Sequence, residues 1–403
     1  MRTRPLALAS MLAFGPLAAA AGDRLELTGL LDVRAVYTDA DTSFLNGGSG
    51  RLRFDKNHDG LRLGRALLAA KFRVSDIWTV NVVGGSYGDY DKNPLDVTEA
   101  WLEARPYPTG SVRYRVRLGA FQLPASLENR STGWTTPYSI TPSAINTWLG
   151  EEIRIVGSEF EAKWLGATHN YDGDIAFTAG AYGWNDPAGA LIADRGWALT
   201  DRQSTLWGGL ARPRIEFIRE VDHKPGYYAG LTWRHHDRLE IRALRYDNRA
   251  DPGATSTDNI AWRTQFTSLG LRWEPDDHWT VIGQSLQGWT YVGGDANSED
   301  QYAESFRSWF VLGSYGWNSD RITLRYDHFS TRQHSGFYGA PTNDDGHALV
   351  FAYLHDFDDH WQAVGEWQQV RSGFPPRVDA GEPETINESQ IQLSIRYRFS
   401  LQR

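Results

Sequence analysis

Cysteine is absent from this sequence of 403 residues, and its two methionines, Met1 and Met11, both lie near the start. A chain without cysteine forms no disulfides, so an exported protein of this sequence depends on hydrogen bonding and burial alone. After residue 21 there is no apolar run approaching the ~18 residues that a membrane-spanning helix needs. The mean hydropathy of −0.49 also argues against a helical membrane protein. The formal charge of −9 argues against nucleic acid as a partner.

The first 21 residues have the pattern of a secretory signal peptide. Arg2 and Arg4 make a basic start, "PLALASMLAFGPLAAAA" (5–21) is apolar, and its last residues are small. We expect cleavage after Ala20 or Ala21, which leaves 22–403 as the mature chain. Losing the two arginines takes the formal charge from −9 to −11, so the mature protein is acidic.

From residue 24 onward, hydrophobicity alternates with a period of two, which is typical of β-strands with two different faces. In the first segment, for example, Leu25 and Leu27 share one face while Arg24 and Glu26 share the other. Sixteen such segments are expected: 24–38, 60–74, 77–89, 97–106, 111–121, 152–166, 172–184, 226–236, 238–248, 260–274, 278–290, 305–316, 320–330, 344–355, 360–370 and 387–401.

The connections between these segments are alternately short and long. Links such as "SD" (75–76) and "HD" (236–237) follow the even segments, whereas longer links rich in Gly, Asp, Asn and Ser follow most odd ones. This sorting is typical of a transmembrane β-barrel, with short turns on one side of the membrane and loops on the other. A soluble β-sandwich has no reason for it.

Seven tryptophans lie within a few residues of the short links: Trp78, Trp164, Trp233, Trp273, Trp279, Trp317 and Trp361. In a barrel they share one height, at the membrane interface that indole rings favour. We therefore expect an all-β fold, a transmembrane antiparallel β-barrel of about 16 strands with short periplasmic turns and long extracellular loops. The whole of 22–403 forms this single domain. Counts of 14 or 18 strands stay open, because 207–219 could contain a further short strand.

The segment "SVRYRVRL" (111–118) places Arg113, Arg115 and Arg117 on the inner face of this barrel. A turn at "PYPTG" (106–110) predicts a register in which Glu103 lies opposite Arg113 and Glu99 opposite Arg117. Glu159 projects inward from the following strand. Two interpretations are compatible with each other: a lattice of ion pairs that stiffens the wall, and a basic wall that attracts anions.

The link that follows the arginines is too long and too apolar for a freely solvated loop. It contains Leu123, Trp134 and Trp148 together with the acidic Glu128. We expect residues 122–150 to fold into the lumen and form a constriction there.

The stretch "RLGAFQLPASLEN" (117–129) resembles the strand-to-loop passage of the phosphate-selective porin O/P family, and the plan of the whole chain resembles Gram-negative outer-membrane porins. The resemblance implies location in the bacterial outer membrane and passive diffusion of small hydrophilic solutes or anions. It also implies outer-membrane lipid and the barrel assembly machinery as partners, and a homotrimer as one assembly. Two features depart from the family: the chain continues past Phe399, where such barrels commonly end, and the overall charge is acidic.

The residues predicted to line the pore are Arg113, Arg115, Arg117, Glu99, Glu103, Glu128, Glu159, Arg34, Arg325 and Arg396. The sequence suggests no catalytic residue, metal ligand or cofactor. "DKNHDG" (55–60) matches only the first half of a calcium loop, since Ala66 occupies the position where a bidentate glutamate belongs. A solvated acidic loop is the preferred interpretation there.

Two other functions are alternatives to a channel. One is an outer-membrane barrel enzyme that acts on lipids or peptides, although "GGSYG" (84–88) is the only hydrolase-like motif and falls at the end of a strand rather than before a helix. The other is a secreted carbohydrate-binding β protein. Detergent dependence separates the latter from a barrel, and bilayer conductance separates an enzyme from a channel.

Overall fold

The computed structural model describes residues 24–88, 95–208, 216–256, 259–294, 301–335 and 341–402. The expected signal peptide lies outside these residues, as does most of the segment in which a further strand remained open. Within the described residues, no helix has the length and apolar character needed to cross a membrane.

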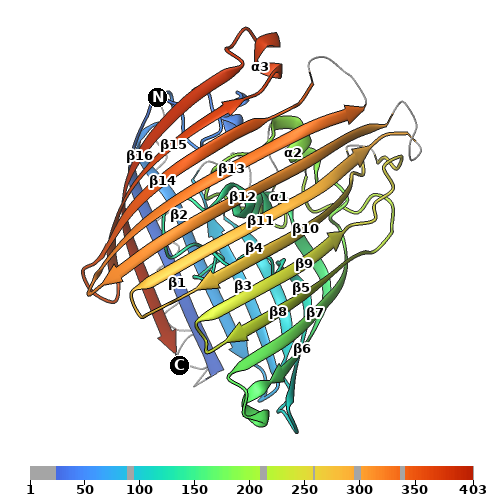
Figure 1. Ribbon diagram of the computed structural model, residues 1–403, viewed down its shortest axis with the longest axis vertical. Coiled ribbons are helices and arrows are strands. Elements are labelled where there is room, and N and C mark those ends of the chain that lie inside the picture. Colours follow the sequence, from blue (N-terminus) through green and yellow to red (C-terminus); the bar gives the residue numbers. More distant parts are fainter. Residues whose placement is uncertain are drawn as a thin grey trace.

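Sixteen antiparallel strands form one closed barrel in which each strand pairs with its neighbours in sequence and β1 pairs with β16 (Figure 1). The prediction of a sixteen-stranded barrel is confirmed. The strands are β1 (Leu25–Thr38), β2 (Gly60–Arg73), β3 (Trp78–Ser86), β4 (Asp96–Ala104), β5 (Val112–Gln122), β6 (Arg154–Leu165), β7 (Gly173–Gly183), β8 (Gly226–His235), β9 (Leu239–Asp247), β10 (Arg263–Trp273), β11 (Trp279–Val292), β12 (Tyr302–Trp317), β13 (Asp320–Ser335), β14 (Asp345–Asp356), β15 (Trp361–Gly373) and β16 (Thr385–Gln402).

Alternation along the strands produces an apolar exterior. In β16, Leu393 is 61% exposed while its neighbours Gln392 and Ser394 are buried. The tryptophans beside the short connections also face outward, and Trp273 and Trp361 are both about half exposed. A closed barrel with such an exterior satisfies its backbone hydrogen bonds internally and can therefore lie in lipid.

Two long connections enter the barrel from the side opposite the short turns. The first, 123–153, contains α1 (Ala144–Glu152), and the second, described over 184–208 and 216–225, contains α2 (Ala190–Arg195). Figure 1 shows α1 within the barrel and α2 nearer its upper opening. A further short helix, α3 (Pro376–Asp379), lies in the connection between β15 and β16.

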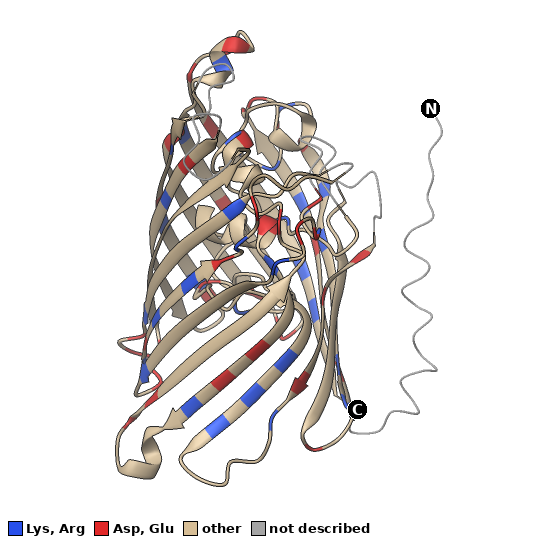
Figure 2. Ribbon diagram, turned by 90° about the vertical axis from the view of Figure 1, so that its right-hand side faces the viewer, with Lys and Arg blue, Asp and Glu red and all other residues tan. Residues whose placement is uncertain are grey.

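The lumen-facing side of β10 to β13 is partly apolar and packs against these two connections. Phe266, Phe306 and Phe310 belong to one buried cluster together with Trp148 of α1 and Trp197 of the second connection. The barrel therefore contains a core of its own. In Figure 2, charged residues appear on the inner segments as well as in bands along the strands of the lower half.

Candidate functional site

Strands β5 and β6 bring two arginines opposite two acidic residues on the lumen side. The register sets Arg115 opposite Glu161 and Arg117 opposite Glu159. Arg115 Nη2 lies 2.8 Å from Glu161 and 3.0 Å from Glu159, and Arg117 Nη2 lies 2.6 Å from Glu159. The Tyr228 hydroxyl donates to Glu159 at 2.7 Å. We call these four charged residues the charge ladder.

Strand β4 has a different register from the one that the sequence predicts. Glu103 lies opposite Arg117, not opposite Arg113. The reason is that Ala104, the last residue of β4, pairs with Val116, so the first four residues of β5 extend beyond β4 and pair with β6 alone. The predictions that Glu103 lies opposite Arg113 and that Glu99 lies opposite Arg117 are therefore wrong.

Three of the predicted residues lie beside the charge ladder without joining it. Glu103 pairs with Arg105 at 2.7 Å. Glu99 accepts a hydrogen bond from the backbone N–H of Gln122 at 2.8 Å. Arg113 is exposed near the short-turn end of β5. Glu99 thus positions the start of the inward connection, and Arg113 is left facing water.

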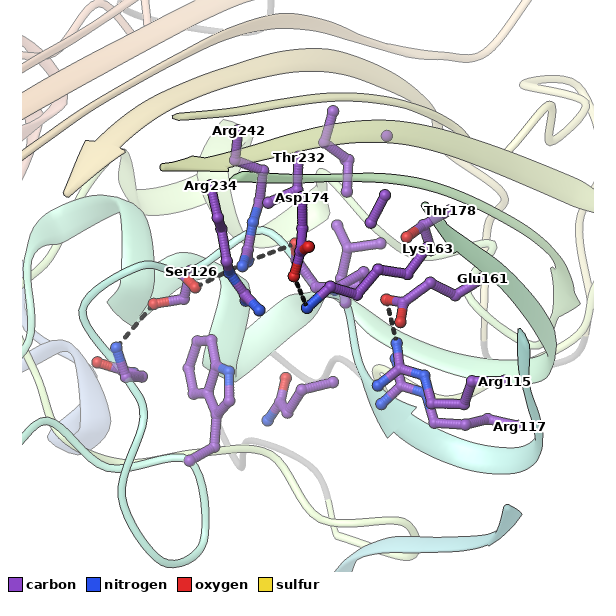
Figure 3. Close-up of a pocket in the computed structure, with 18 of the residues that line it drawn as sticks. Arg115, Arg117, Ser126, Glu161, Lys163, Asp174, Thr178, Thr232, Arg234 and Arg242 are labelled. Carbon is purple, nitrogen blue, oxygen red and sulfur yellow. Dashed lines mark hydrogen bonds and ion pairs between the residues drawn. The ribbon is translucent and has the colours of Figure 1, made fainter. Parts of the chain in front are cut away.

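A cavity of about 280 Å³ opens beside the charge ladder, between the wall and the start of the first inward connection. Figure 3 shows Arg234 and Arg242 on one side of it and Arg115 and Arg117 on the other. The charged residues that line it are Arg115, Arg117, Lys163, Arg234 and Arg242, together with Glu99, Glu161 and Asp174. Glu159 pairs with Arg115 and Arg117, and Glu240 pairs with Arg234 and Arg242, so most of these charges are matched and the cavity can hold a polar solute.

Arg325 of β13 holds the first inward connection against the barrel wall. This arginine donates to the carbonyls of Thr141 at 2.7 Å and Pro142 at 3.0 Å, and it pairs with Glu128 at 3.0 Å. Both charged side chains are fully buried. Glu128 and Arg325 therefore hold the connection within the barrel.

Helix α1 is placed by polar groups at its start and aromatic contacts along its length. Ser143 is its N-cap, and Asp327 of β13 accepts the N–H of Ala144 at 3.0 Å. The Trp148 ring lies 5.4 Å from that of Phe266 and 5.1 Å from that of Phe306, measured between centroids. Such buried ring pairs contribute beyond their area alone.

The second inward connection is anchored by Asp201, which the sequence analysis did not single out. Its carboxylate lies 2.5 Å from Arg34, 2.9 Å from Arg53 and 3.5 Å from Arg65. Burial alone would raise the pKa of Asp201, but the arginines outweigh it and hold that pKa well below its usual range. The sequence did contain a signal for this segment, because residues 188–199 are largely apolar, and most of them are buried. The reasoning applied to 122–150, that a long apolar connection folds into the lumen, could have identified it.

Three arginines predicted to line the pore face the lumen but are covered by the inward connections. Arg34 and Arg325 have no exposed surface, and Arg396 is 4% exposed. Arg34 pairs with Asp32 at 2.8 Å and Arg396 lies 3.3 Å from the same carboxylate. Solute does not reach these side chains while the inward connections are in place, and their role as pore-lining residues of an open channel stays a prediction. They serve to hold the inward segments and the wall together.

Glu152, the last residue of α1, lies where the two inward connections meet. Its carboxylate accepts from Trp148 Nε1 at 2.5 Å and from the backbone N–H of Leu191 at 2.7 Å. Burial raises the pKa of Glu152 to about 7, although these hydrogen bonds oppose the shift. The contact between the two connections therefore contains a carboxyl group that titrates near neutral pH.

Among the described residues, one acidic group has the spacing for a cation: oxygens of Asp186, Glu220 and Asp222 lie within 4.8 Å of one another. Glu220 already accepts the N–H of Trp184 at 2.7 Å. In the expected solvated loop at 55–60, Asp55 is instead fully buried and accepts the N–H of Ser43 at 2.9 Å. Asp55 therefore shapes the turn, whereas residues 56–58 and Gly60 of this loop are exposed, as expected.

Comparison with known proteins gives similarity in fold. No family model and no curated protein matches the sequence. An anion-selective porin from Comamonas acidovorans shares 13% identity, with a TM-score of 0.54 over 93% of this chain and 99% of the other. The outer membrane channel DcaP of Acinetobacter baumannii shares 12%, with a TM-score of 0.55 over 93% and 97%. The trimer form of OmpT, an outer membrane protein of Vibrio cholerae, shares 10%, with a TM-score of 0.51 over 93% and 99%.

The chain thus has the sixteen-stranded fold of outer-membrane porins. Together with its lipid-facing exterior, this fold indicates a protein of the bacterial outer membrane.

Proposed function

We propose that this protein is an outer-membrane channel for small hydrophilic solutes, with a preference for anions, and that it is not an enzyme. The observation that supports the proposal best is the 280 Å³ cavity, in which five basic side chains face three acidic ones beside the charge ladder. Partly exposed charges of both signs line a water-accessible space there, as expected for a route that polar solutes follow.

The inward connections imply that conductance is low unless they move. They cover Arg34 and Arg325 completely, and Trp148 and Trp197 fill the lumen between them. We propose that solute passes when part of these connections is displaced.

The proposed partners are outer-membrane lipid, the barrel assembly machinery and two further copies of the chain. The apolar exterior supports the first, and the barrel fold supports the second. The fold shared with the trimer form of OmpT supports the third.

Planar-bilayer recording of the folded protein tests the proposal. Deleting 126–146 removes most of the first inward connection and should raise single-channel conductance several-fold while the sixteen strands still form. Thermal stability should fall, because Arg325 loses its buried partner Glu128 and α1 loses its N-cap Ser143. A matched control deletes 379–381, exposed residues of the connection between β15 and β16, and should leave conductance unchanged.

Three results would contradict the channel. Absence of conductance in both the intact protein and the 126–146 deletion would rule out a solute path. Hydrolysis of lipids or peptides by a non-conducting barrel would favour the enzyme instead. A protein that stays monodisperse without detergent would favour the secreted carbohydrate-binding protein, which the exposed apolar side chains of the barrel argue against.

A further inference from the structure

The arginines around Asp201 include one guanidinium group whose donors are incompletely used. Arg34 donates to Asp32 at 2.8 Å, to Asp201 at 2.5 Å and to Gln392 at 3.1 Å. Arg65, 1% exposed, lies farther away, at 3.6 Å from Asp32 and 3.5 Å from Asp201. Its Nε and Nη2 atoms are buried and have no hydrogen-bond partner within the described part of the chain. A buried donor without a partner is costly, so Arg65 favours any acceptor that reaches it.

A small cavity of about 10 Å³ lies beside Arg65. Arg65 and Asp201 line it, together with Asn129 and Trp134 of the first inward connection. This volume is at the lower limit for a single water molecule. A larger ligand can therefore reach the donors of Arg65 only if the Asp201 side chain moves away.

The small cavity adjoins the 280 Å³ cavity beside the charge ladder. Asn129 and Trp134 line both cavities, so these two side chains separate them. Trp134 is partly exposed and lies at the tip of a hairpin turn that Ser131 and Thr135 close with backbone hydrogen bonds of 2.9 and 3.3 Å. A solute in the larger cavity thus meets Trp134 on its way to Arg65.

The ligand of these arginines in the closed barrel is a carboxylate of the chain itself. Asp201 pairs with Arg53 at 2.9 Å as well as with Arg34 and Arg65. Guanidinium groups pair with any carboxylate in the same geometry. A carboxylate on a solute can therefore make the pairs that Asp201 makes, and it can also use the two free donors of Arg65.

Asp201 supplies a charged contact in a part of the second inward connection whose neighbouring contacts are neutral. The N–H of Thr200 donates to the Thr147 hydroxyl at 3.1 Å, and the N–H of Ser204 donates to the Gly150 carbonyl at 3.1 Å. Buried ion pairs are more costly to break than neutral hydrogen bonds, unless another partner replaces the one that is lost. A competing carboxylate is such a partner.

We propose that Asp201 autoinhibits the channel and that a small carboxylate solute opens it by replacing the Asp201 side chain on Arg34, Arg53 and Arg65. The inference rests on the proposed channel function and adds the class of solute and the trigger. A ligand shifts such an equilibrium only through its preference for one state. Acetate at a hundred times its dissociation constant from the open state should raise the ratio of open to closed protein about a hundredfold.

Single-channel recording with acetate tests the proposal, because acetate reproduces the aspartate side chain and acetamide is its neutral isostere. At constant ionic strength, the open probability of the parent should rise with acetate and should not respond to acetamide. Arg65→Gln should stay closed without acetate, since the contacts of Arg65 with Asp201 are long, and should need about tenfold more acetate to open, the effect of one charge-assisted hydrogen bond. Arg238→Gln, which changes an exposed arginine at a short turn, is the matched control and should respond like the parent.

Hydrogen exchange of the folded protein in detergent gives a readout that does not depend on conductance. Backbone amides of 197–204 should exchange faster in acetate than in acetamide, while those of the barrel strands keep their rates. Arg65→Gln should reduce this difference, and Arg65→Lys, which keeps the charge, should restore part of it. Heat-modifiable gel mobility shows whether each variant has folded, and the comparison of acetate with acetamide on the parent needs no variant.

Equal responses of the parent to acetate and acetamide in both assays would overturn the proposal. An acetate response that is the same in the parent and in folded Arg65→Gln would overturn it as well, because the carboxylate would then act at another site. The 126–146 deletion separates these failures from failure of the proposed channel. A deletion that conducts, together with a parent that is indifferent to acetate, would refute the autoinhibition and leave the channel unaffected.

Discussion

Asp201 offers the sharpest test of how the lumen is closed. Its carboxylate is the shared partner of Arg34, Arg53 and Arg65, and all four side chains are nearly or fully buried. Replacing Asp201 with Asn keeps the size of the side chain and removes the charge. Arg34 and Arg65 then keep Asp32 as a buried carboxylate, at 2.8 Å and 3.6 Å.

The size of the effect follows from the burial of the group. Removing one partner of a buried ion pair costs about 3–5 kcal/mol, because an uncompensated charge stays behind in a medium of low dielectric constant. At about 1.4 kcal/mol per factor of ten, the ratio of docked to undocked second connection should fall at least a hundredfold. Undocking would admit water to Arg34, which is fully buried in this structure.

Single-channel recording of Asp201→Asn should therefore show more frequent or longer open events than the parent. Asp194→Asn is the matched control, because Asp194 lies in the same connection with an exposed side chain; it should behave like the parent. Gel mobility before and after heating shows whether each barrel has folded.

Unchanged open probability and unchanged thermal stability in folded Asp201→Asn would refute the reasoning. Such a result would mean that apolar packing around Trp197 alone holds the second connection in place. Lower thermal stability without a gain in open probability would instead show that Asp201 stabilises the barrel wall and does not control docking of the second connection.

Three other tests address the wall, the charge ladder and the pH response. Leu231→Asp changes a side chain that is 52% exposed on the lipid-facing side and should destabilise the assembled barrel by up to a few kcal/mol. Thr232→Asp, at the adjacent lumen-facing position, should still fold, as gel mobility would show. Equal yields of the two folded variants would reverse our assignment of faces. Arg115→Ala with Arg117→Ala should shift the reversal potential toward cations, most strongly at low salt; lower stability with unchanged selectivity would make the pair structural. Because the pKa of Glu152 is raised to about 7 in the docked state, docking of the connections is strongest below the ordinary pKa of about 4.5 and weakens as pH rises through 7. Conductance should therefore rise between pH 6 and 8, and Glu152→Gln should flatten that rise. An identical pH profile in the variant would show that Glu152 does not cause the response.

The strands could be predicted from the sequence because the exterior meets a single solvent. Lipid requires an apolar residue at every second position, so alternation such as that around Leu393 marks each strand and its face. The alternation of short and long connections then identified the ends of the barrel. Neither signal depends on distant contacts.

The interior was less predictable because some lumen-facing side chains contact water and others contact the inward connections. A lumen-facing polar residue can face water, as Arg115 does in part, or be sealed beneath a connection, as Arg34 and Ser394 are. Alternation gives the same pattern in both cases. Which of the two applies depends on the path of 184–205, and that path depends on contacts such as Asp201 with Arg34, far apart in the sequence.

The apolar cluster around Trp148 and Phe306 gives the docking of the inward connections a different temperature dependence from the stability of the barrel wall. Parting the inward connections would transfer that cluster from protein contacts to water, a change with a positive heat capacity. The closed state should then be most favoured at an intermediate temperature and should weaken on cooling as well as on heating. The outer wall exchanges its contacts with lipid, where water contributes no such effect. Permeability and barrel stability can thus respond to temperature in opposite directions within one chain.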